Sequence, residues 1–319
     1  MNAEILAVGT ELLLGDIVNT NAQFIAQGLA ELGINVFYHT VVGDNPERMK
    51  NAMHSAFERA DIIITTGGLG PTEDDITKEI GAGYFGRKLI LDEKALNGIE
   101  KFFSKMGREM TENNRKQAMV PEGSAVMYND NGTAPGIMIE DQDKILIMMP
   151  GPPREMKPMF NDQVKPFLAS RQKYVLVSRT LRIAGVGESA METAVRDIID
   201  RQTNPTVAPY AKEVECVLRI TARGKTQEEA DELIKPVAEE IYSRLGNNLY
   251  AEGDTSIQNV VAEMLVKSGR TIAVAESCTG GLVASKLVEY AGISSVFIEG
   301  AVTYTNDAKI RRLGVLNET

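Results

Sequence analysis

The chain has 319 residues, of which 43% are hydrophobic and 24% are charged, and its net charge is −10 at pH 7. This is an ordinary globular composition, at a length where two or three domains are expected. The acidic charge argues against a general nucleic-acid-binding protein, which carries a basic face. No apolar run reaches membrane-spanning length and no leader segment opens the chain, so we expect a cytoplasmic protein that contacts no membrane.

The first part of the chain alternates strands and helices. The predicted strands cover residues 3–8, 35–42, 62–66, 125–128, 135–140 and 144–149, and the predicted helices include residues 21–32 and 46–59. Such alternation predicts an α/β fold with a doubly wound, mostly parallel sheet. Ligands of these sheets bind outside the carboxyl ends of the strands.

The most informative stretch, DIIITTGGLGPTEDDITKEIG, follows from residue 61. A buried strand runs into a glycine loop, and Glu73, Asp74 and Asp75 then open a predicted helix. Backbone N–H groups of such a loop can bind phosphate, and adjacent carboxylates can hold a divalent metal. The loop lacks the Gly-Lys-Ser/Thr ending of a P-loop and the spacing of G-x-G-x-x-G. A plain turn before an acidic helix start is the alternative interpretation.

Three predicted loops share one edge of the sheet. They are Gly9-Thr10-Glu11, Gly43-Asp44-Asn45 and residues 67–75. Because each follows a strand of the same sheet, we expect them to form one pocket. The proline-rich loop at residues 149–155 leaves another strand and forms either a rigid wall of this pocket or a simple turn.

A polar, helix-like stretch at residues 107–119 carries Arg108, Arg115 and Lys116. These side chains are candidates for clamping a phosphate. An ordinary solvated helix face is the alternative for each of them.

A second unit is predicted between residues 172 and 250. Its strands cover residues 175–183, 206–208 and 213–222, and its helices cover residues 188–201 and 227–245. This is a small α+β pattern without a catalytic constellation, and we interpret it as a spacer or an oligomerisation domain.

A third unit begins near residue 255 and places Ser277 on a sharp turn between a strand at residues 271–275 and a helix. A serine in this position is a candidate nucleophile, because helix amides can stabilise an oxyanion. The chain has only two histidines, both in the first sixty residues, so Tyr304 and Lys309 are the nearest candidate bases. The alternatives are a structural N-cap serine, or Cys278 as the nucleophile.

Motifs along almost the whole chain resemble, in the same order, those of the CinA family of competence/damage-inducible proteins. They are VGTELLLGDIVNTNAQFIAQGL, TTGGLGPTEDDIT, NRKQAMVP, GTAPG, MPGPPREM, AESCTGGLVASKL and TYTNDAK. The resemblance implies a molybdopterin-binding domain of the MoaB/MogA type at residues 1–170 and a small KH-like α+β linking domain at residues 171–252. It also implies part of an α/β amidohydrolase domain at residues 253–319.

The resemblance further implies two activities. The first domain would hydrolyse ADP-ribose with a divalent metal (Mg, Mn or Co), with Asp44 and Asp75 as its acidic pair. The third would deamidate nicotinamide mononucleotide, with Ser277 as nucleophile and Tyr304 and Lys309 in the site. The residues assigned to metal binding are Asp44, Asp74 and Asp75, and those assigned to substrate binding are Gly9, Thr10, Glu11, Thr66, Gly67, Gly68, Gly70, Asn114, Arg115, Gly151 and Pro152.

The C-terminal domain of the family continues beyond the position equivalent to Thr319. We therefore expect residues 253–319 to be an incomplete domain, too short to bury its own core and inactive as a deamidase. For the first domain, a module that binds a pterin or nucleotide without chemistry is the alternative, since a fold does not fix a function. A DNA-damage scaffold finds no basic patch. We expect a homodimer, the commonest oligomer.

Overall fold

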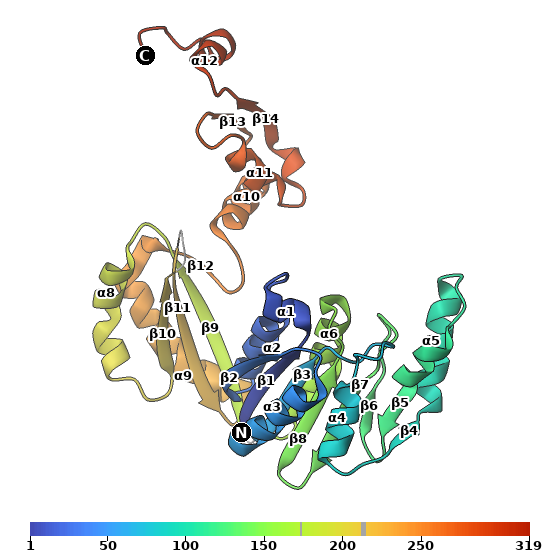
Figure 1. The fold of residues 1–319 in the computed structure, drawn as a ribbon. Helices are drawn as coiled ribbons and strands as arrows, with labels where there is room; N and C mark the ends of the chain where they lie inside the picture. The colour runs from blue at the N-terminus through green and yellow to red at the C-terminus, as the bar shows by residue number, and fades with distance from the viewer. Residues whose placement is uncertain (173, 212–214) are drawn as a thin grey trace. The chain divides into compact units, whose positions relative to one another are not determined.

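The computed structural model describes residues 1–172, 174–211 and 215–319. It divides into two compact units, residues 1–176 and residues 177–319 (Figure 1). Within the described ranges, no helix is both long enough and apolar enough to cross a membrane.

The first unit is built on a six-stranded sheet. Its strands are β1 (Asn2–Val8), β2 (Asn35–Val42), β3 (Ile62–Thr66), β6 (Ala125–Met127), β7 (Gly136–Asp141) and β8 (Lys144–Met149), and a separate pair is formed by β4 (Leu89–Leu91) and β5 (Met119–Pro121). Its helices are α1 (Thr10–Leu14), α2 (Thr20–Glu31), α3 (Pro46–Arg59), α4 (Thr77–Tyr84), α5 (Glu93–Lys105), η1 (Glu112–Ala118), α6 (Pro153–Met159), η2 (Phe160–Val164) and α7 (Lys165–Ala169).

The strand order is β2-β1-β3-β8-β7-β6. The strands β2, β1, β3 and β8 pair in parallel, whereas β7 and β6 pair antiparallel with their neighbours. The predicted mostly parallel α/β sheet is therefore confirmed. Because the four parallel strands run the same way, their carboxyl ends lie at one edge of the sheet.

Helices cover both faces of this sheet, as expected for a doubly wound fold. Side chains of a strand alternate between faces, so Ile62 and Ile64 of β3 pack in one core with residues of α2, α6 and η2. Ile63 packs in the other core, with the apolar face of α3. The strand is buried on both faces, and this explains why its sequence is a continuous apolar run.

The helix after β3 begins later than predicted. It begins at Thr77, and Glu73, Asp74 and Asp75 lie in the turn that precedes it. The Thr77 N–H donates to the Gly68 carbonyl (3.1 Å) and its hydroxyl donates to the Gly67 carbonyl (2.9 Å). Thr77 thus folds the chain back onto the glycine loop, and the acidic residues remain outside the helix.

The side chain of Lys78 connects α4 to η1 by hydrogen bonds. Its side chain is only 1% exposed, and its ammonium group donates to the carbonyl oxygens of Lys116 (2.6 Å) and Gln117 (3.2 Å). Burial lowers the pKa of Lys78 from 10.5 to about 8. The buried ammonium group satisfies two carbonyl groups at the end of the short helix.

The second unit begins with a four-stranded sheet in the order β10-β11-β9-β12. Its elements are β9 (Val175–Ile183), α8 (Glu188–Asp200), β10 (Thr206–Ala211), β11 (Cys216–Gly224), α9 (Gln227–Leu245), η3 (Gly246–Asn248) and β12 (Leu249–Glu252). Both helices pack on the sheet through one apolar core. The predicted small α+β pattern is present, although the expected start of its third strand at Glu213 lies outside the described residues.

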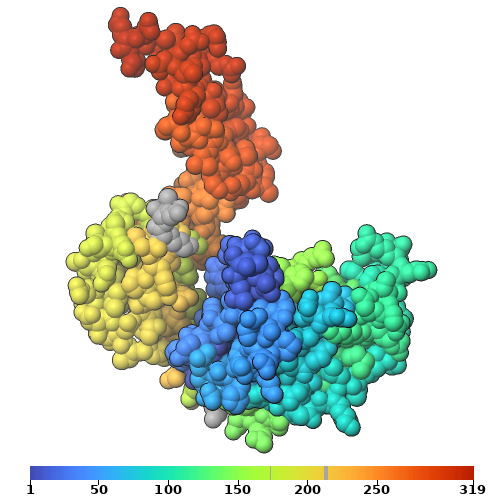
Figure 2. All heavy atoms as spheres, viewed as in Figure 1, coloured from blue at the N-terminus to red at the C-terminus, as the bar shows by residue number. Residues whose placement is uncertain are grey.

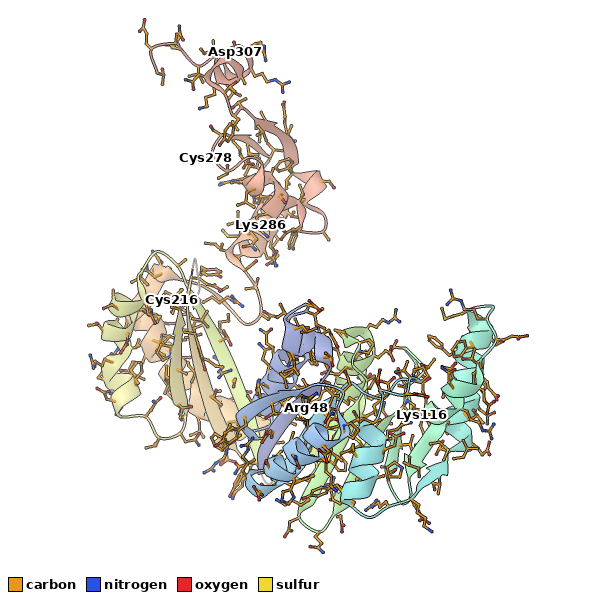
Figure 3. All side chains as sticks on the ribbon, viewed as in Figure 1. Arg48, Lys116, Cys216, Cys278, Lys286 and Asp307 are labelled. Carbon is orange, nitrogen blue, oxygen red and sulfur yellow. The ribbon has the colours of Figure 1, made fainter. Side chains whose placement is uncertain are left out.

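The remainder of the second unit is a strand–helix segment with a small core. Its elements are α10 (Ile257–Ser268), β13 (Ile272–Glu276), α11 (Leu282–Val288), η4 (Ile293–Ser295), β14 (Phe297–Val302) and α12 (Asn306–Leu313). Strands β13 and β14 form a two-stranded parallel sheet. Its buried cluster consists of Ala262, Leu287, Ile293 and Val296. Cys216 on β11 and Cys278 after β13 are both free thiols (Figure 3).

Close packing at Gly28 of α2 predicts an unusual response to mutation. A Cβ atom there would lie 2.4 Å from Cε1 of Phe160, whereas a Cβ atom on Gly98 of α5 would meet nothing within 4 Å. We expect Gly98→Ala to raise the free energy of unfolding by about 0.5–1 kcal/mol, because alanine is the better helix former. Gly28→Ala should lower it by about 1 kcal/mol or more, because overpacking outweighs that gain. Urea unfolding checks both, and a stabilised Gly28→Ala variant would refute the packing argument.

The pKa of Lys78 predicts a pH dependence of stability. Since this pKa is about 8 in the fold and 10.5 as its ordinary value, the unfolded chain binds more protons between these pH values. The stability of the wild type relative to Lys78→Met should therefore rise by up to about 3 kcal/mol between pH 7 and pH 10. Urea unfolding followed by the methyl NMR signals of β3 measures this difference. A difference that stays constant with pH would contradict the prediction.

Candidate functional site

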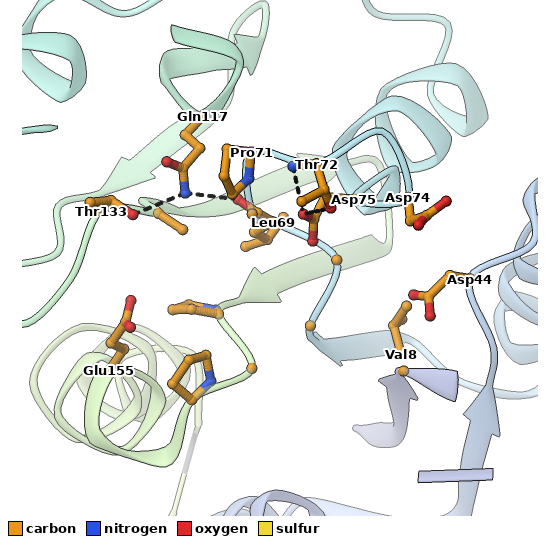
Figure 4. Close-up of a pocket in the computed structure, with 18 of the residues that line it drawn as sticks. Val8, Asp44, Leu69, Pro71, Thr72, Asp74, Asp75, Gln117, Thr133 and Glu155 are labelled. Carbon is orange, nitrogen blue, oxygen red and sulfur yellow. Dashed lines mark hydrogen bonds between the residues drawn. The ribbon is translucent and has the colours of Figure 1, made fainter. Parts of the chain in front are cut away.

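A cavity of about 470 Å³ lies at the carboxyl ends of β1, β2, β3 and β8 (Figure 4). The loops after these four strands line it, together with residues of η1, α6 and the β6–β7 connection. The lining residues are Val8, Gly9, Glu11, Asp44, Gly67, Gly68, Leu69, Gly70, Pro71, Thr72, Asp74, Asp75, Gln117, Thr133, Ala134, Pro150, Gly151, Pro152 and Glu155.

Most of the predicted binding residues lie at this cavity. Those that line it are Gly9, Glu11, Asp44, Gly67, Gly68, Gly70, Asp74, Asp75, Gly151 and Pro152. Thr10 contacts Asp44 beside the cavity, and Thr66 lines a smaller adjoining cavity with Asn21. Two predicted residues lie elsewhere: Asn114 is buried and donates to Gln117, and Arg115 is exposed.

The glycine loop after β3 approaches its neighbours too closely for larger residues. Gly67 and Gly68 have φ angles of 99° and 67°, in the left-handed region that favours glycine. A Cβ atom on Gly67 would lie 2.2 Å from the Val8 carbonyl oxygen, and one on Gly68 would lie 2.1 Å from the Thr77 hydroxyl. The loop therefore packs directly against β1 and the start of α4.

Three successive amides of this loop are available to a ligand. The Gly67 N–H donates to the Met149 carbonyl (3.0 Å), which leaves the next residues free of the sheet. Within the described ranges, the N–H groups of Gly68, Leu69 and Gly70 donate no hydrogen bond. Successive free amides in a turn form an anion-binding concavity.

Two carboxylates at the cavity are held in place through one oxygen each. Oδ2 of Asp44 accepts from the Thr10 N–H (3.1 Å) and the Thr10 hydroxyl (2.8 Å). Oδ2 of Asp75 accepts from the N–H (3.0 Å) and the hydroxyl of Thr72. Their Oδ1 atoms accept no hydrogen bond from the part of the chain that is described. Each carboxylate is thus oriented and keeps one oxygen for a ligand.

Lys116 fixes the turn that carries Asp75 (Figure 3). Its ammonium group donates to the carbonyl oxygens of Thr72 (2.9 Å) and Asp75 (2.6 Å). Lys116 was one of three predicted phosphate clamps. Its ammonium group instead contacts the backbone of the loop and pairs with the Glu79 carboxylate (3.6 Å). Arg108 and Arg115 are exposed and do not line the cavity.

The lining of the cavity is strongly acidic. Five carboxylates line it and no Lys, Arg or His is among the described residues that do so. The acidic residues are Glu11, Asp44, Asp74, Asp75 and Glu155. Like charges around one cavity repel one another, and a bound cation relieves that repulsion. The cavity is therefore suited to a cation, or to an anion that arrives with one.

The carboxylates do not form a complete metal cage. Among the described residues, no group of three or more His, Cys, Asp or Glu side chains is arranged to hold a metal ion. The set Asp44, Asp74 and Asp75 therefore remains a prediction. Mg²⁺ ions in proteins need only one or two carboxylates and complete their coordination with water and phosphate.

Three residues that the sequence analysis did not single out also line the cavity. The Gln117 side-chain amide donates to the Thr133 hydroxyl (3.1 Å) and the Leu69 carbonyl (3.4 Å). Glu155 is buried, accepts from the Asn129 amide (2.8 Å), and has its pKa raised by burial. Gln117 and Glu155 lie inside the motifs NRKQAMVP and MPGPPREM, so the motifs located the segments but not the side chains.

The predicted site around Ser277 has a different geometry. The buried carboxylate of Glu276 accepts from the N–H groups of Gly281 (3.0 Å), Val283 (3.0 Å) and Ala284 (2.8 Å). The helix-start amides expected to stabilise an oxyanion are therefore already occupied. In the described chain, neither Tyr304, which is 70% exposed, nor Lys309 forms a hydrogen bond with Ser277.

Comparison with known proteins identifies the parts of the chain. Residues 4–170 match the family described as "Probable molybdopterin binding domain", residues 178–251 match the "Damage-inducible protein CinA KH domain", and residues 254–319 match the "CinA C-terminal domain". A solved structure titled "The crystal structure of the protein CinA with unknown function from Thermoplasma acidophilum" is 38% identical, covers 52% of this chain and 96% of that chain, and has a TM-score of 0.48.

Two relatives match along the whole chain. A "Putative competence-damage inducible protein" of Clostridium beijerinckii is 57% identical over 318 residues, which span 100% of this chain and 78% of that protein. A "CinA-like protein" of Dictyoglomus thermophilum is 55% identical over 318 residues, which span 77% of its length. The order of the three matched domains and these identities confirm the predicted resemblance, and the chain belongs to the CinA family of competence/damage-inducible proteins.

Proposed function

We propose that the first domain hydrolyses the diphosphate bond of ADP-ribose, in a reaction that depends on a divalent metal ion. The observation that carries the proposal is the pairing of two features at one cavity. Free amides of Gly68, Leu69 and Gly70 are suited to phosphate oxygens. Five carboxylates in the same lining are suited to a cation that accompanies the phosphate.

The residues divide the work of the reaction. The glycine-loop amides bind and orient the diphosphate, and the free oxygens of Asp44 and Asp75 would hold the metal ion. A divalent ion supplies Lewis-acid polarisation of phosphoryl oxygens and a water of lowered pKa. A water oxygen bonds to one phosphorus while the bridging P–O bond breaks, and the bridging oxygen leaves with the other phosphate. The products are AMP and ribose phosphate.

A binding module without catalysis is the second candidate. It is favoured by the absence, among the described residues, of a three-ligand metal cluster, and by the family description of residues 4–170 as a molybdopterin-binding domain. In that case the cavity would hold a pterin or a nucleotide phosphate. Binding would then persist when divalent metal is removed.

Metal dependence and the two aspartates distinguish these candidates. We expect a chelator to abolish ADP-ribose hydrolysis and Mg²⁺, Mn²⁺ or Co²⁺ to restore it. Asp44→Asn and Asp75→Asn should each lower kcat/KM at least about 100-fold, which is a loss of roughly 3 kcal/mol of transition-state stabilisation. The measurement is a chromatographic time course of AMP release.

Asp143→Asn is the matched control, because Asp143 is exposed in the β7–β8 turn, at the opposite end of β8 from the cavity. It should keep wild-type activity. Hydrolysis that persists in chelator, or an active Asp75→Asn variant, would refute the metal mechanism. Binding of ADP-ribose without turnover would support the module.

The third domain generates a separate prediction. Glu276 occupies the amides of Gly281, Val283 and Ala284, so these three helix-start amides are not available to an oxyanion near Ser277. We expect this chain to leave nicotinamide mononucleotide unchanged in the same time course that releases AMP from ADP-ribose. Formation of the nicotinic acid mononucleotide would contradict this prediction.

The predicted homodimer is part of the proposal and rests on the frequency of twofold symmetric oligomers. Sedimentation equilibrium of the full chain measures it directly.

A further inference from the structure

A second and larger cavity, of about 780 Å³, lies between α5 and residues 128–135. Helix α5 lies at the surface of the first unit, in teal in Figure 2. Thr133 lines both this cavity and the one that holds the carboxylates. The two cavities therefore share a wall residue on the β6–β7 connection.

The charge of the second cavity is opposite to that of the first. Lys94, Lys101 and Lys105 line it, opposed only by Glu93 and Asp130, whereas no basic side chain is among the described residues lining the first cavity. We call the second cavity the lysine groove. The three lysines lie seven and four residues apart, a spacing that places them on one face of a helix.

The lysines of the groove are not held in close ion pairs by the carboxylates that the structure describes. Within the described ranges, none of the three forms a salt bridge, and the Lys94 ammonium group lies 3.8 Å from the centre of the Tyr128 ring. One face of Tyr128 is thus covered by a cation, the ring packs against the small core beneath α5, and its hydroxyl is hydrogen-bonded to Asp92. The groove offers ammonium groups to a ligand rather than an aromatic face.

The floor of the groove is open at its centre. Gly98 lies between Lys94 and Lys101 on the same helix face, and a Cβ atom there would meet nothing within 4 Å. Beside it, Ala95 and Ile99 are buried and anchor α5 to the core. The absence of a side chain at Gly98 keeps the space between the lysines accessible.

From this arrangement we infer that the lysine groove binds the nucleoside arm of the diphosphate substrate. We further infer that it favours a nucleoside that carries an additional phosphate. The inference rests on the proposed function, because it places the diphosphate in the first cavity. A nucleoside whose ribose carries no phosphate offers no anionic partner to the three lysine ammonium groups of the groove. A phosphate monoester on that arm provides one, since lysine ammonium groups bind phosphate as point charges. The substrate class is therefore a nucleoside diphosphate sugar with a further phosphate on its nucleoside.

The test compares ADP-ribose with its 2′-phosphate on the full-length chain in the presence of Mg²⁺. We expect kcat/KM to be at least about fivefold higher for the 2′-phosphate, mostly through a lower KM, and the preference to shrink at high salt. The double variant Lys101→Glu/Lys105→Glu should reduce the ratio of the two kcat/KM values to one or below. Lys50→Glu, an exposed lysine on α3 outside both cavities, should preserve the ratio.

A second variant tests the position of the arm without changing charge. Gly98→Leu fills the centre of the groove and should raise KM for both substrates at least about threefold, with circular dichroism unchanged. If the wild type turns over neither compound, the proposed function fails. Calorimetry on the same variants then gives the ratio of the dissociation constants of the two compounds. This ratio tests, without turnover, whether the lysine groove recognises the additional phosphate. A ratio near one in the wild type, or a ratio unaffected by the lysine substitutions, would overturn the inference.

Discussion

The contact between the glycine loop and the end of β1 is the constraint on which the candidate site depends. At Gly67 the backbone lies so close to the Val8 carbonyl that a Cβ atom has no room. This approach directs the loop over the edge of the sheet, where Thr77 ties it to α4 and Lys116 ties its far end to η1. Lys78 in turn holds η1 from beneath. The backbone of the site is thus positioned by successive contacts to backbone carbonyl groups. Few of the side chains that line the cavity are needed to stabilise it.

This scaffold allows the protein to concentrate negative charge. The carboxylates of Asp44 and Asp75 each accept two hydrogen bonds from a threonine, which fix the position of one oxygen of each. No cationic side chain among the described residues of the lining offsets the five acids. Such an arrangement opposes folding stability and is typical of sites that bind cations. The lysine groove, which shares Thr133 with this cavity, is lined by Lys94, Lys101 and Lys105, so the two cavities carry opposite charge.

The sequence was sufficient to predict the sheet but not the details of the site. Strand β3 was predictable because burial on both faces requires a continuous apolar run, and α3 because Asn45 and Pro46 mark its start. The predicted start of α4 was wrong, because Thr77 forms a hydrogen bond back to the glycine loop. That tertiary contact outweighs the local preference of acidic residues for a first helical turn. Gln117 and Thr133 were missed as lining residues because they reach the cavity from segments far apart in the chain, whereas Glu155 lies in the 149–155 loop that was offered as a wall of the pocket.

The two glycine turns of the chain show why such a pattern alone does not predict a ligand site. Both follow a strand and precede a helix, and both carry glycines with left-handed φ angles. After β3, whose last residue is Thr66, the amides of Gly68, Leu69 and Gly70 remain free in the described chain. After β13, whose last residue is Glu276, a carboxylate of the protein itself occupies the helix-start amides. The residue that ends β13 thus occupies the amides of its turn, whereas Thr66 at the end of β3 leaves the amides of Gly68, Leu69 and Gly70 free in the described chain.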